Sequence, residues 1–151
     1  MEKRKISIAQ ASESFEIPKL EEFRLGDWST VGDNRVVFTS GFSDGGRLKY
    51  GAFLHERTGK LVKKLPLSGG TLGPVVSDDH IVAGGGANGA TPAVFSREKL
   101  KKVAGLKGHK SQINGLSRLG DSYVTIGGRN SRPADDTLRL WDAGTLKETL
   151  K

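Results

Sequence analysis

The 151 residues of the chain include 21 glycines and no cysteine, and their formal net charge is +7. Without cysteine the chain can form neither a disulfide framework nor a thiolate metal site, and it has no cysteine nucleophile. No apolar stretch near the N-terminus has the length of a signal peptide, and none is long enough to span a bilayer. We therefore expect an intracellular protein, cytoplasmic or nuclear, without membrane contact.

The glycines are scattered between short apolar runs and follow no three-residue period. This excludes collagen and indicates many tight turns. Short apolar runs separated by such turns predict an all-β fold. The charge is uneven along the chain: residues 1–56 contain 8 basic and 9 acidic side chains, whereas residues 57–151 contain 16 and 8.

Residues 1–22 differ from the rest of the chain because they are rich in charged residues and serine. Their one alternating stretch, residues 6–9 (Ile-Ser-Ile-Ala), is the only strand candidate that we find there. We expect this segment to be an N-terminal arm that can pair with a neighbouring sheet.

The remainder of the chain repeats. The strand candidates are residues 28–31, 36–41, 50–54 and 61–67, then 71–77, 81–85, 92–95 and 100–106, then 113–119, 123–128, 138–141 and 146–150. Gly41, Gly84 and Gly127 lie at the end of the second run of each unit or one residue before it, and they are 43 residues apart. Four short strands per unit at this period are what a propeller blade requires, and the runs are too short for amphipathic helices. We divide the chain into an arm (1–22) and blade-like repeats at 23–67, 68–107 and 108–151.

The third unit resembles a WD40 repeat. It opens with Gly108-His109, ends its third predicted strand with Trp141-Asp142, and carries Asp135 in the turn before that strand. The resemblance implies a buried hydrogen-bond network in which His109, Asp135 and Trp141 are joined by a Ser/Thr on the second strand. That position falls on Ile126, so we expect the network to be interrupted here.

The other two units match the family less completely. In the first, residues 39–44 resemble the family's second strand and turn, which implies that Ser40 and Asp44 belong to the same structural network. Leu54 takes the place of the tryptophan in the first unit, and Phe95 takes it in the second. The resemblance implies an all-β fold, a partial β-propeller of about three four-stranded antiparallel blades.

Two motifs also allow a catalytic or cofactor-binding interpretation. His109 could be an acid, a base or a metal ligand, but the three histidines show no ligand spacing, and we favour a buried structural role. Residues 84–89 (Gly-Gly-Gly-Ala-Asn-Gly) satisfy the G-x-G-x-x-G pattern of dinucleotide-binding turns. Pro92 would fall early in the helix that such a turn requires, so we favour a plain turn and expect no cofactor, no metal and no enzymatic activity.

The basic residues divide into two groups. Lys63, Lys64, Lys99, Lys101, Lys102 and Lys147 lie on or beside the fourth predicted strand of a unit, where lysine blocks edge-to-edge aggregation. A second set falls in the loops between strands, which in the WD40 family lie on one partner-binding face. We expect these residues to form a polar binding rim: Arg47, Asn88, Lys107, Lys110, Arg129 and Arg132.

Three blades are too few for a closed propeller, which uses about 4–8. We therefore expect two open lateral faces, covered by self-association or by docking onto another sheet, unless the chain is a piece of a longer propeller. The function we expect is a non-enzymatic protein-interaction scaffold. An RNA- or ribonucleoprotein-associated propeller, favoured by the basic residues of 57–151, is the alternative. A nucleotide-binding enzyme that uses residues 84–89 ranks third.

Overall fold

The structure, a computed structural model, describes residues 24–86, 91–128, 135 and 137–150, and for residues 24–26 and 42–44 it describes the backbone alone. The expected arm at residues 1–22, with its strand candidate at 6–9, lies outside the described residues.

Twelve strands fall within the described residues, and none of these residues is helical. Sheet 1 contains β1 (Arg24–Thr30), β2 (Arg35–Asp44), β3 (Arg47–Glu56) and β4 (Leu61–Leu67). Sheet 2 contains β5 (Val75–Val76), β6 (His80–Ala83), β7 (Ala93–Ser96) and β8 (Lys102–Gly105). Sheet 3 contains β9 (Ile113–Leu119), β10 (Ser122–Gly127), β11 (Leu138–Asp142) and β12 (Glu148–Leu150). Each sheet is an antiparallel meander in chain order, so the predicted all-β fold of three four-stranded units is confirmed.

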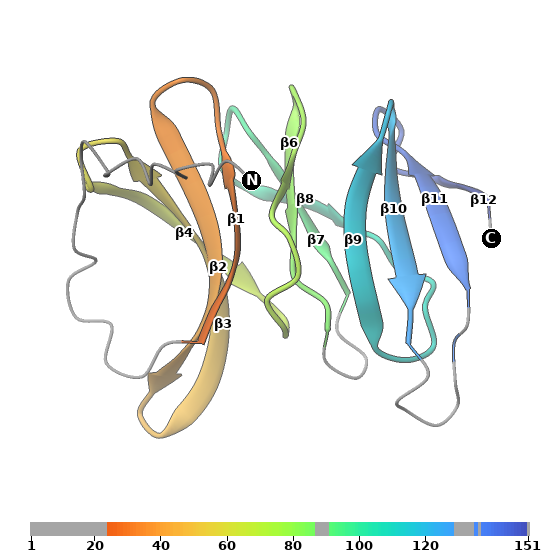
Figure 1. Cartoon of the computed structure of the whole chain (residues 1–151), viewed down its shortest axis with the longest axis horizontal. Helices are drawn as coiled ribbons and strands as arrows, with labels where there is room; N and C mark the ends of the chain where they lie inside the picture. Colours follow the sequence, from red (N-terminus) through yellow and green to blue (C-terminus); the bar gives the residue numbers. More distant parts are fainter. Residues whose placement is uncertain (1–23, 87–90, 129–134, 136, 151) are drawn as a thin grey trace, which may run out of the picture.

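The three sheets stand side by side, with sheet 2 in the middle (Figure 1). Successive residues of a strand point to opposite faces, and sheet 2 uses both. Ile81 and Phe95 belong to one buried cluster with residues of sheet 1, whereas Val82 and Val94 belong to a second cluster with Tyr123 and other residues of sheet 3. Sheet 2 is therefore buried on both sides.

The register of β2–β3, β6–β7 and β10–β11 identifies equivalent positions. His55 pairs with Val36, Phe95 with Ile81, and Trp141 with Tyr123. In each sheet the next residue donates its backbone N–H to a carbonyl oxygen across the following turn. These bonds run from Glu56 to Lys60, from Ser96 to Lys101 and from Asp142 to Lys147. The assignment of Phe95 to the tryptophan position agrees with this register. The assignment of Leu54 was wrong by one residue, because His55 occupies the position and Leu54 points to the opposite face.

The expected turn of the first unit was also wrong. Gly41 does not end a strand, because β2 continues to Asp44 and pairs along its whole length with β3. The two strands are joined by Gly45 and Gly46, with φ values of 59° and 74°. A two-residue hairpin loop favours positive φ at both positions, which glycine adopts without steric cost.

The two outer sheets differ in how their far sides are covered. On the side of sheet 1 away from sheet 2, Phe38 and Phe53 stack with ring centroids 5.4 Å apart, and both are 7% exposed, whereas His55 is 2% exposed. On the corresponding side of sheet 3, large apolar side chains such as Ile126 remain exposed. The expectation of two open lateral faces therefore holds for sheet 3. On sheet 1 it is wrong for the centre of the far side, but it holds at β1, where Trp28, the cross-strand partner of Phe38, is 70% exposed.

Candidate functional site

A hollow of about 400 Å³ lies at the end of the molecule where β6 and β10 end and β3 and β9 begin (Figure 1). Sheet 1 contributes Gly41, Leu48 and Tyr50 to the walls of the hollow. Residues 70–72 precede β5, and Gly86 follows β6. Residues 112–114, at the start of β9, complete the walls. The walls combine apolar side chains with an amide, a phenol and glycine backbone, a combination that can contact an extended peptide.

The wall formed by residues 70–72 is held in place by a buried hydroxyl of sheet 1. The hydroxyl oxygen of Thr39 lies 2.6 Å from the carbonyl oxygen of Thr71 and 3.0 Å from that of Gly73. These contacts join β2 to the segment that precedes β5. Thr39 is fully buried, so the segment is held by the core rather than by a surface contact.

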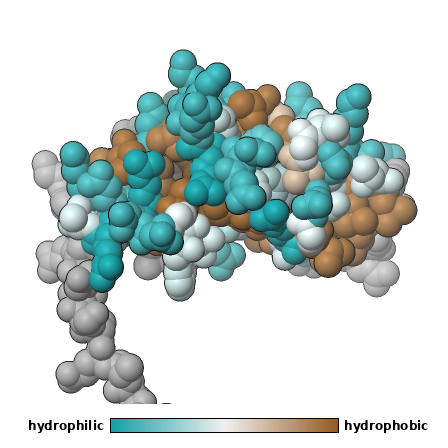
Figure 2. Space-filling model, turned by 90° about the horizontal axis from the view of Figure 1, so that it is seen from above, coloured by the Kyte–Doolittle hydropathy of each residue, from teal (hydrophilic) through white to brown (hydrophobic). Residues whose placement is uncertain are grey.

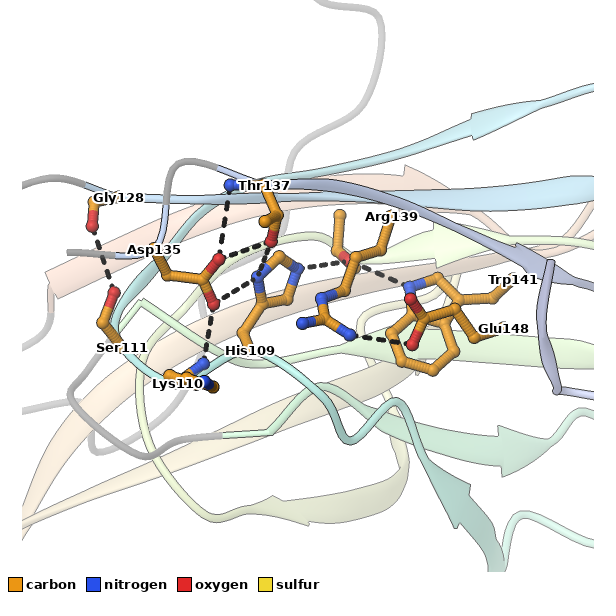
Figure 3. A network of polar contacts seen from close by, with 10 residues as sticks. His109, Lys110, Ser111, Gly128, Asp135, Thr137, Arg139, Trp141 and Glu148 are labelled. Carbon is orange, nitrogen blue, oxygen red and sulfur yellow. Dashed lines mark hydrogen bonds and ion pairs between the residues drawn. The ribbon is translucent and has the colours of Figure 1, made fainter. Parts of the chain in front are cut away.

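A buried polar network holds the loops of sheet 3 at the same end (Figure 3). His109 Nδ1 lies 3.0 Å from Asp135 Oδ2, and His109 Nε2 lies 2.8 Å from Thr125 Oγ1. Trp141 donates its indole N–H to the same Thr125 oxygen at 2.8 Å. The structure thus brings three of the predicted network residues together, and the member that sequence reasoning missed is Thr125.

The prediction that Ile126 interrupts this network was wrong. β10 pairs with β11 so that Thr125 faces the same side as Tyr123, toward the core, while Ile126 is 46% exposed on the other side. Side chains alternate between the two faces of a strand, so of these two neighbouring positions only Thr125 lies on the side of Tyr123 and Trp141. The alignment of the motif on the sequence was therefore displaced by one residue.

The polar atoms of the network find their partners within the chain. The Trp141 N–H can only donate, so Thr125 Oγ1 accepts from it. Both ring nitrogens of His109 have a partner, Thr125 Oγ1 for Nε2 and Asp135 Oδ2 for Nδ1. Such an arrangement is expected of a buried structural network rather than of a base awaiting a substrate.

Asp135 is the anchor of this network. Burial opposes its ionisation, but hydrogen bonds from the Thr137 hydroxyl, the Lys110 backbone N–H and His109 outweigh that effect and hold the pKa of the carboxyl below its ordinary value. The Lys110 N–H donates to Oδ2 at 2.6 Å, and the Thr137 hydroxyl donates to Oδ1. The carboxylate therefore ties the loop before β9 to the loop before β11.

The other predicted site residues lie apart from this network. Ser40 is buried in sheet 1, where its hydroxyl donates to the Gly41 carbonyl oxygen at 3.1 Å. Asp44 is the last residue of β2, and its side chain lies outside the described residues. Of the predicted binding rim, Arg47, Lys107 and Lys110 are exposed, whereas Asn88, Arg129 and Arg132 lie outside the described residues.

The glycines of residues 84–86 serve close backbone packing. Gly84 donates its N–H to the Leu72 carbonyl at 2.8 Å, and Gly85 donates to that of Gly69 at 2.9 Å. A Cβ atom at Gly70 would lie 1.3 Å from the Gly85 carbonyl oxygen. Within the described residues the next element after these glycines is strand β7, whereas a dinucleotide-binding turn leads into a helix whose N-terminus holds the pyrophosphate.

A second polar contact joins sheets 2 and 3 at the opposite end of the molecule. The Tyr123 hydroxyl lies 2.8 Å from Ser77 Oγ and 3.3 Å from His80 Nδ1. Burial raises the pKa of the Tyr123 phenol, and the hydrogen bond with Ser77 acts in the opposite direction. The phenol thus stays a neutral partner for Ser77 over the physiological pH range.

The exposed lysines lie where the sequence predicts them. Lys63 and Lys64 belong to edge strand β4, and Lys102 begins edge strand β8. Lys101 immediately precedes β8, and Lys147 immediately precedes β12. Among the described residues, no group of three or more His, Cys, Asp or Glu side chains could hold a metal ion. The same part of the chain contains no helix with the length and apolarity needed to cross a bilayer.

Neither a protein-family model nor a curated protein sequence matches the chain.

Proposed function

We propose that the chain is a non-enzymatic protein-interaction scaffold, built from WD40-like propeller blades, that binds an extended segment of a protein partner in the hollow at its loop end. The observation that carries this proposal is the hollow of about 400 Å³ between three sheets. Recurring binding sites of this kind are concave, combine apolar walls with a few polar groups, and lie where separate elements meet.

Three features support the interpretation of the sheets as blades. The three meanders share one register, with His55, Phe95 and Trp141 at equivalent positions. The network of His109, Thr125, Asp135 and Trp141 joins the residue types that the resemblance to WD40 repeats implies. β5 also contacts both β1 and β9, so the first strands of the three sheets are neighbours, as around a common axis.

Selection of a displayed random-peptide library on the full chain tests the function. Selected peptides are expected to bind in the hollow, so Tyr50→Ala and Leu48→Asp should each weaken binding by about tenfold or more. The matched control is Leu61→Asp, because Leu61 is exposed on β4 outside the hollow, as Leu48 is exposed at its wall. Equal affinity of the selected peptides for the hollow variants and the parent chain contradicts the proposal.

An RNA-associated role is the second candidate, favoured by the exposed Arg47, Lys107 and Lys110 in the strands and loops at this end. Each phosphate that such residues neutralise releases counterions, so the logarithm of the binding constant should fall steeply and linearly with the logarithm of the salt concentration. A binding titration with single-stranded RNA at several salt concentrations separates the two functions, since peptide binding in the hollow is expected to depend weakly on salt.

A further inference from the structure

The far side of sheet 1, which points away from sheet 2, is closed at its centre although no described sheet lies over it. Sheet 1 stands at one end of the row, and sheets 2 and 3 both lie on its other side (Figure 1). Phe38 and Phe53 are nevertheless only 7% exposed, His55 is 2% exposed, and Ser40 is fully buried. Strand alternation places these four side chains on the far side, because their neighbours along β2 and β3 face sheet 2.

The register of the sheets shows how closed this side is. In sheet 2 the pair equivalent to the two phenylalanines is Ala83 and Ala93, which are buried beneath sheet 1. An uncovered face looks different. On the outer side of sheet 3, Val124 and Leu140 remain partly exposed even at the centre, and Ile126 is 46% exposed. In Figure 2 hydrophobic surface gathers at that end of the molecule, on the right. The far side of sheet 1 thus has the burial of a covered face.

The described side chains of the far side leave its outer surface to be covered by another segment. The ring of Phe38 stacks on those of Phe53 and His55, with centroids 5.4 Å apart in both pairs. Stacking covers the faces that the rings turn to one another and leaves their outer edges open. Lys64 places its Nζ 5.7 Å from the centroid of the Phe53 ring, which shields one ring in part. Trp28, next to Phe38 on β1, is 70% exposed and gives little cover.

The chain has one segment outside the described residues that is joined to sheet 1. The others are short and belong to sheets 2 and 3, at residues 87–90, 129–134, 136 and 151. The N-terminal arm leads through Phe23 into β1 at Arg24, which pairs with Gly41, three positions along β2 from Phe38. Three positions are about 10 Å, whereas 22 extended residues reach about 70 Å. The arm carries five large apolar side chains: Ile6, Ile8, Phe15, Ile17 and Leu20.

We propose that the N-terminal arm, residues 1–22, folds back over the far side of sheet 1 and packs its apolar side chains on Phe38, Phe53 and His55. The arm then takes the place that a further sheet would occupy on this side, as sheet 1 covers the equivalent positions of sheet 2. A partner sheet can stack on sheet 1 only after the arm leaves. Peptide binding in the hollow is a separate property, because none of these three side chains lines it.

Thiol reactivity tests the cover, because the chain has no cysteine of its own and a single substitution gives a unique probe. Ser40→Cys places a thiol beneath the proposed cover. Ala52→Cys is the matched control, since Ala52 is fully buried in the same sheet but on the side that faces sheet 2. Each thiol is introduced into the full chain with the parent arm and into a full chain whose arm has its five large apolar side chains replaced by serine.

With the parent arm, both thiols should react slowly with Ellman's reagent because both positions are buried. With the serine arm, the thiol of Ser40→Cys should react at least about tenfold faster, whereas that of Ala52→Cys should keep its rate. An arm with Ser7→Asn, Ser12→Asn and Ser14→Asn keeps the apolar side chains and should leave both rates unchanged. A Ser40→Cys thiol that reacts as slowly with the serine arm as with the parent arm, or a rise that Ala52→Cys shares equally, overturns the proposal.

Cross-linking of the unsubstituted chain gives a second measurement that does not depend on the folding of any variant. A short amine-reactive cross-linker is applied at low protein concentration, and the joined peptides are identified by mass spectrometry. Lys64 lies on the far side of sheet 1, so it should be joined to the lysines of the arm. Lys102 of sheet 2 and Lys147 before β12 are exposed comparators. Arm lysines joined to these two as often as to Lys64 overturn the proposal.

Discussion

Thr125 is the residue on which the buried network of sheet 3 depends, because its single oxygen contacts both His109 and Trp141. Thr125→Val keeps the shape of the side chain and removes the hydroxyl, which leaves a buried indole N–H and a buried imidazole nitrogen unsatisfied. We expect the free energy of unfolding to fall by about 2–4 kcal/mol, measured by urea denaturation. Thr125→Ser is the control, because it keeps the hydroxyl and should cost clearly less. Equal losses for the two variants would mean that the hydroxyl contributes nothing.

Asp135 makes the stability of the chain depend on pH in the acidic range. The pKa of its carboxyl is lower in the folded chain than in the unfolded chain. Its contribution is therefore complete above the unfolded pKa, about 3.9, and declines as the pH falls from there toward the folded pKa. Asp135→Asn should destabilise the chain at pH 7, and the difference from the parent in urea denaturation should shrink at pH 3. Asp121→Asn, in an exposed turn, is the control; a difference that does not change with pH would contradict the assignment.

The candidate site could be predicted from the sequence only where a residue carries a distinctive motif. His109, Asp135 and Trp141 stand in the order and chemistry of a known repeat, so their association could be predicted. Thr125 was missed because the choice between positions 125 and 126 depends on the pairing of β10 with β11, which places Thr125 on the side of Tyr123 and Trp141. The walls of the hollow were missed for a related reason. Leu48, Gln112 and Asn114 come from two different sheets, and their proximity depends on how those sheets stack.

Among the secondary-structure elements, the segment before β5 and the end of β6 approach most closely, at Gly70 and Gly85. Gly70→Ala would place a methyl group 1.3 Å from the Gly85 carbonyl oxygen, at a φ of +70°. Gly45 has a similar φ of +59°, but a Cβ added there would meet nothing within 4 Å. Gly45→Ala therefore measures only the cost of holding a non-glycine residue at positive φ, about 1 kcal/mol. We expect Gly70→Ala to cost at least about 2 kcal/mol more than Gly45→Ala in thermal or urea unfolding. Similar costs would show that the backbone approach can relax freely.

The strands themselves were predicted well because their signal is local. Apolar runs of four to seven residues between glycine- or charge-containing turns correspond to strands in all three sheets, and β4 and β9 begin and end where the pattern predicts. The β2–β3 hairpin was not foreseen, because Gly41 has the sequence environment of a turn and yet pairs with Tyr50 inside a strand. Turn position is decided by pairing with the partner strand as well as by glycine content.

At the scale of the whole molecule, stability is expected to concentrate in sheet 2, because it alone is buried on both sides by the described sheets. Val82 and Val124 occupy equivalent register positions, which offers a matched comparison. Val82 is fully buried between sheets 2 and 3, whereas Val124 lies on the open face of sheet 3. Val82→Ala removes buried methyl groups and leaves a cavity, so it should cost about 2 kcal/mol.

Val124→Ala should cost less than about 1 kcal/mol, because the Val124 side chain is only partly buried. Urea denaturation of the two variants measures both costs. A larger cost for Val124→Ala than for Val82→Ala would contradict the assignment of sheet 2 as the centre of the core.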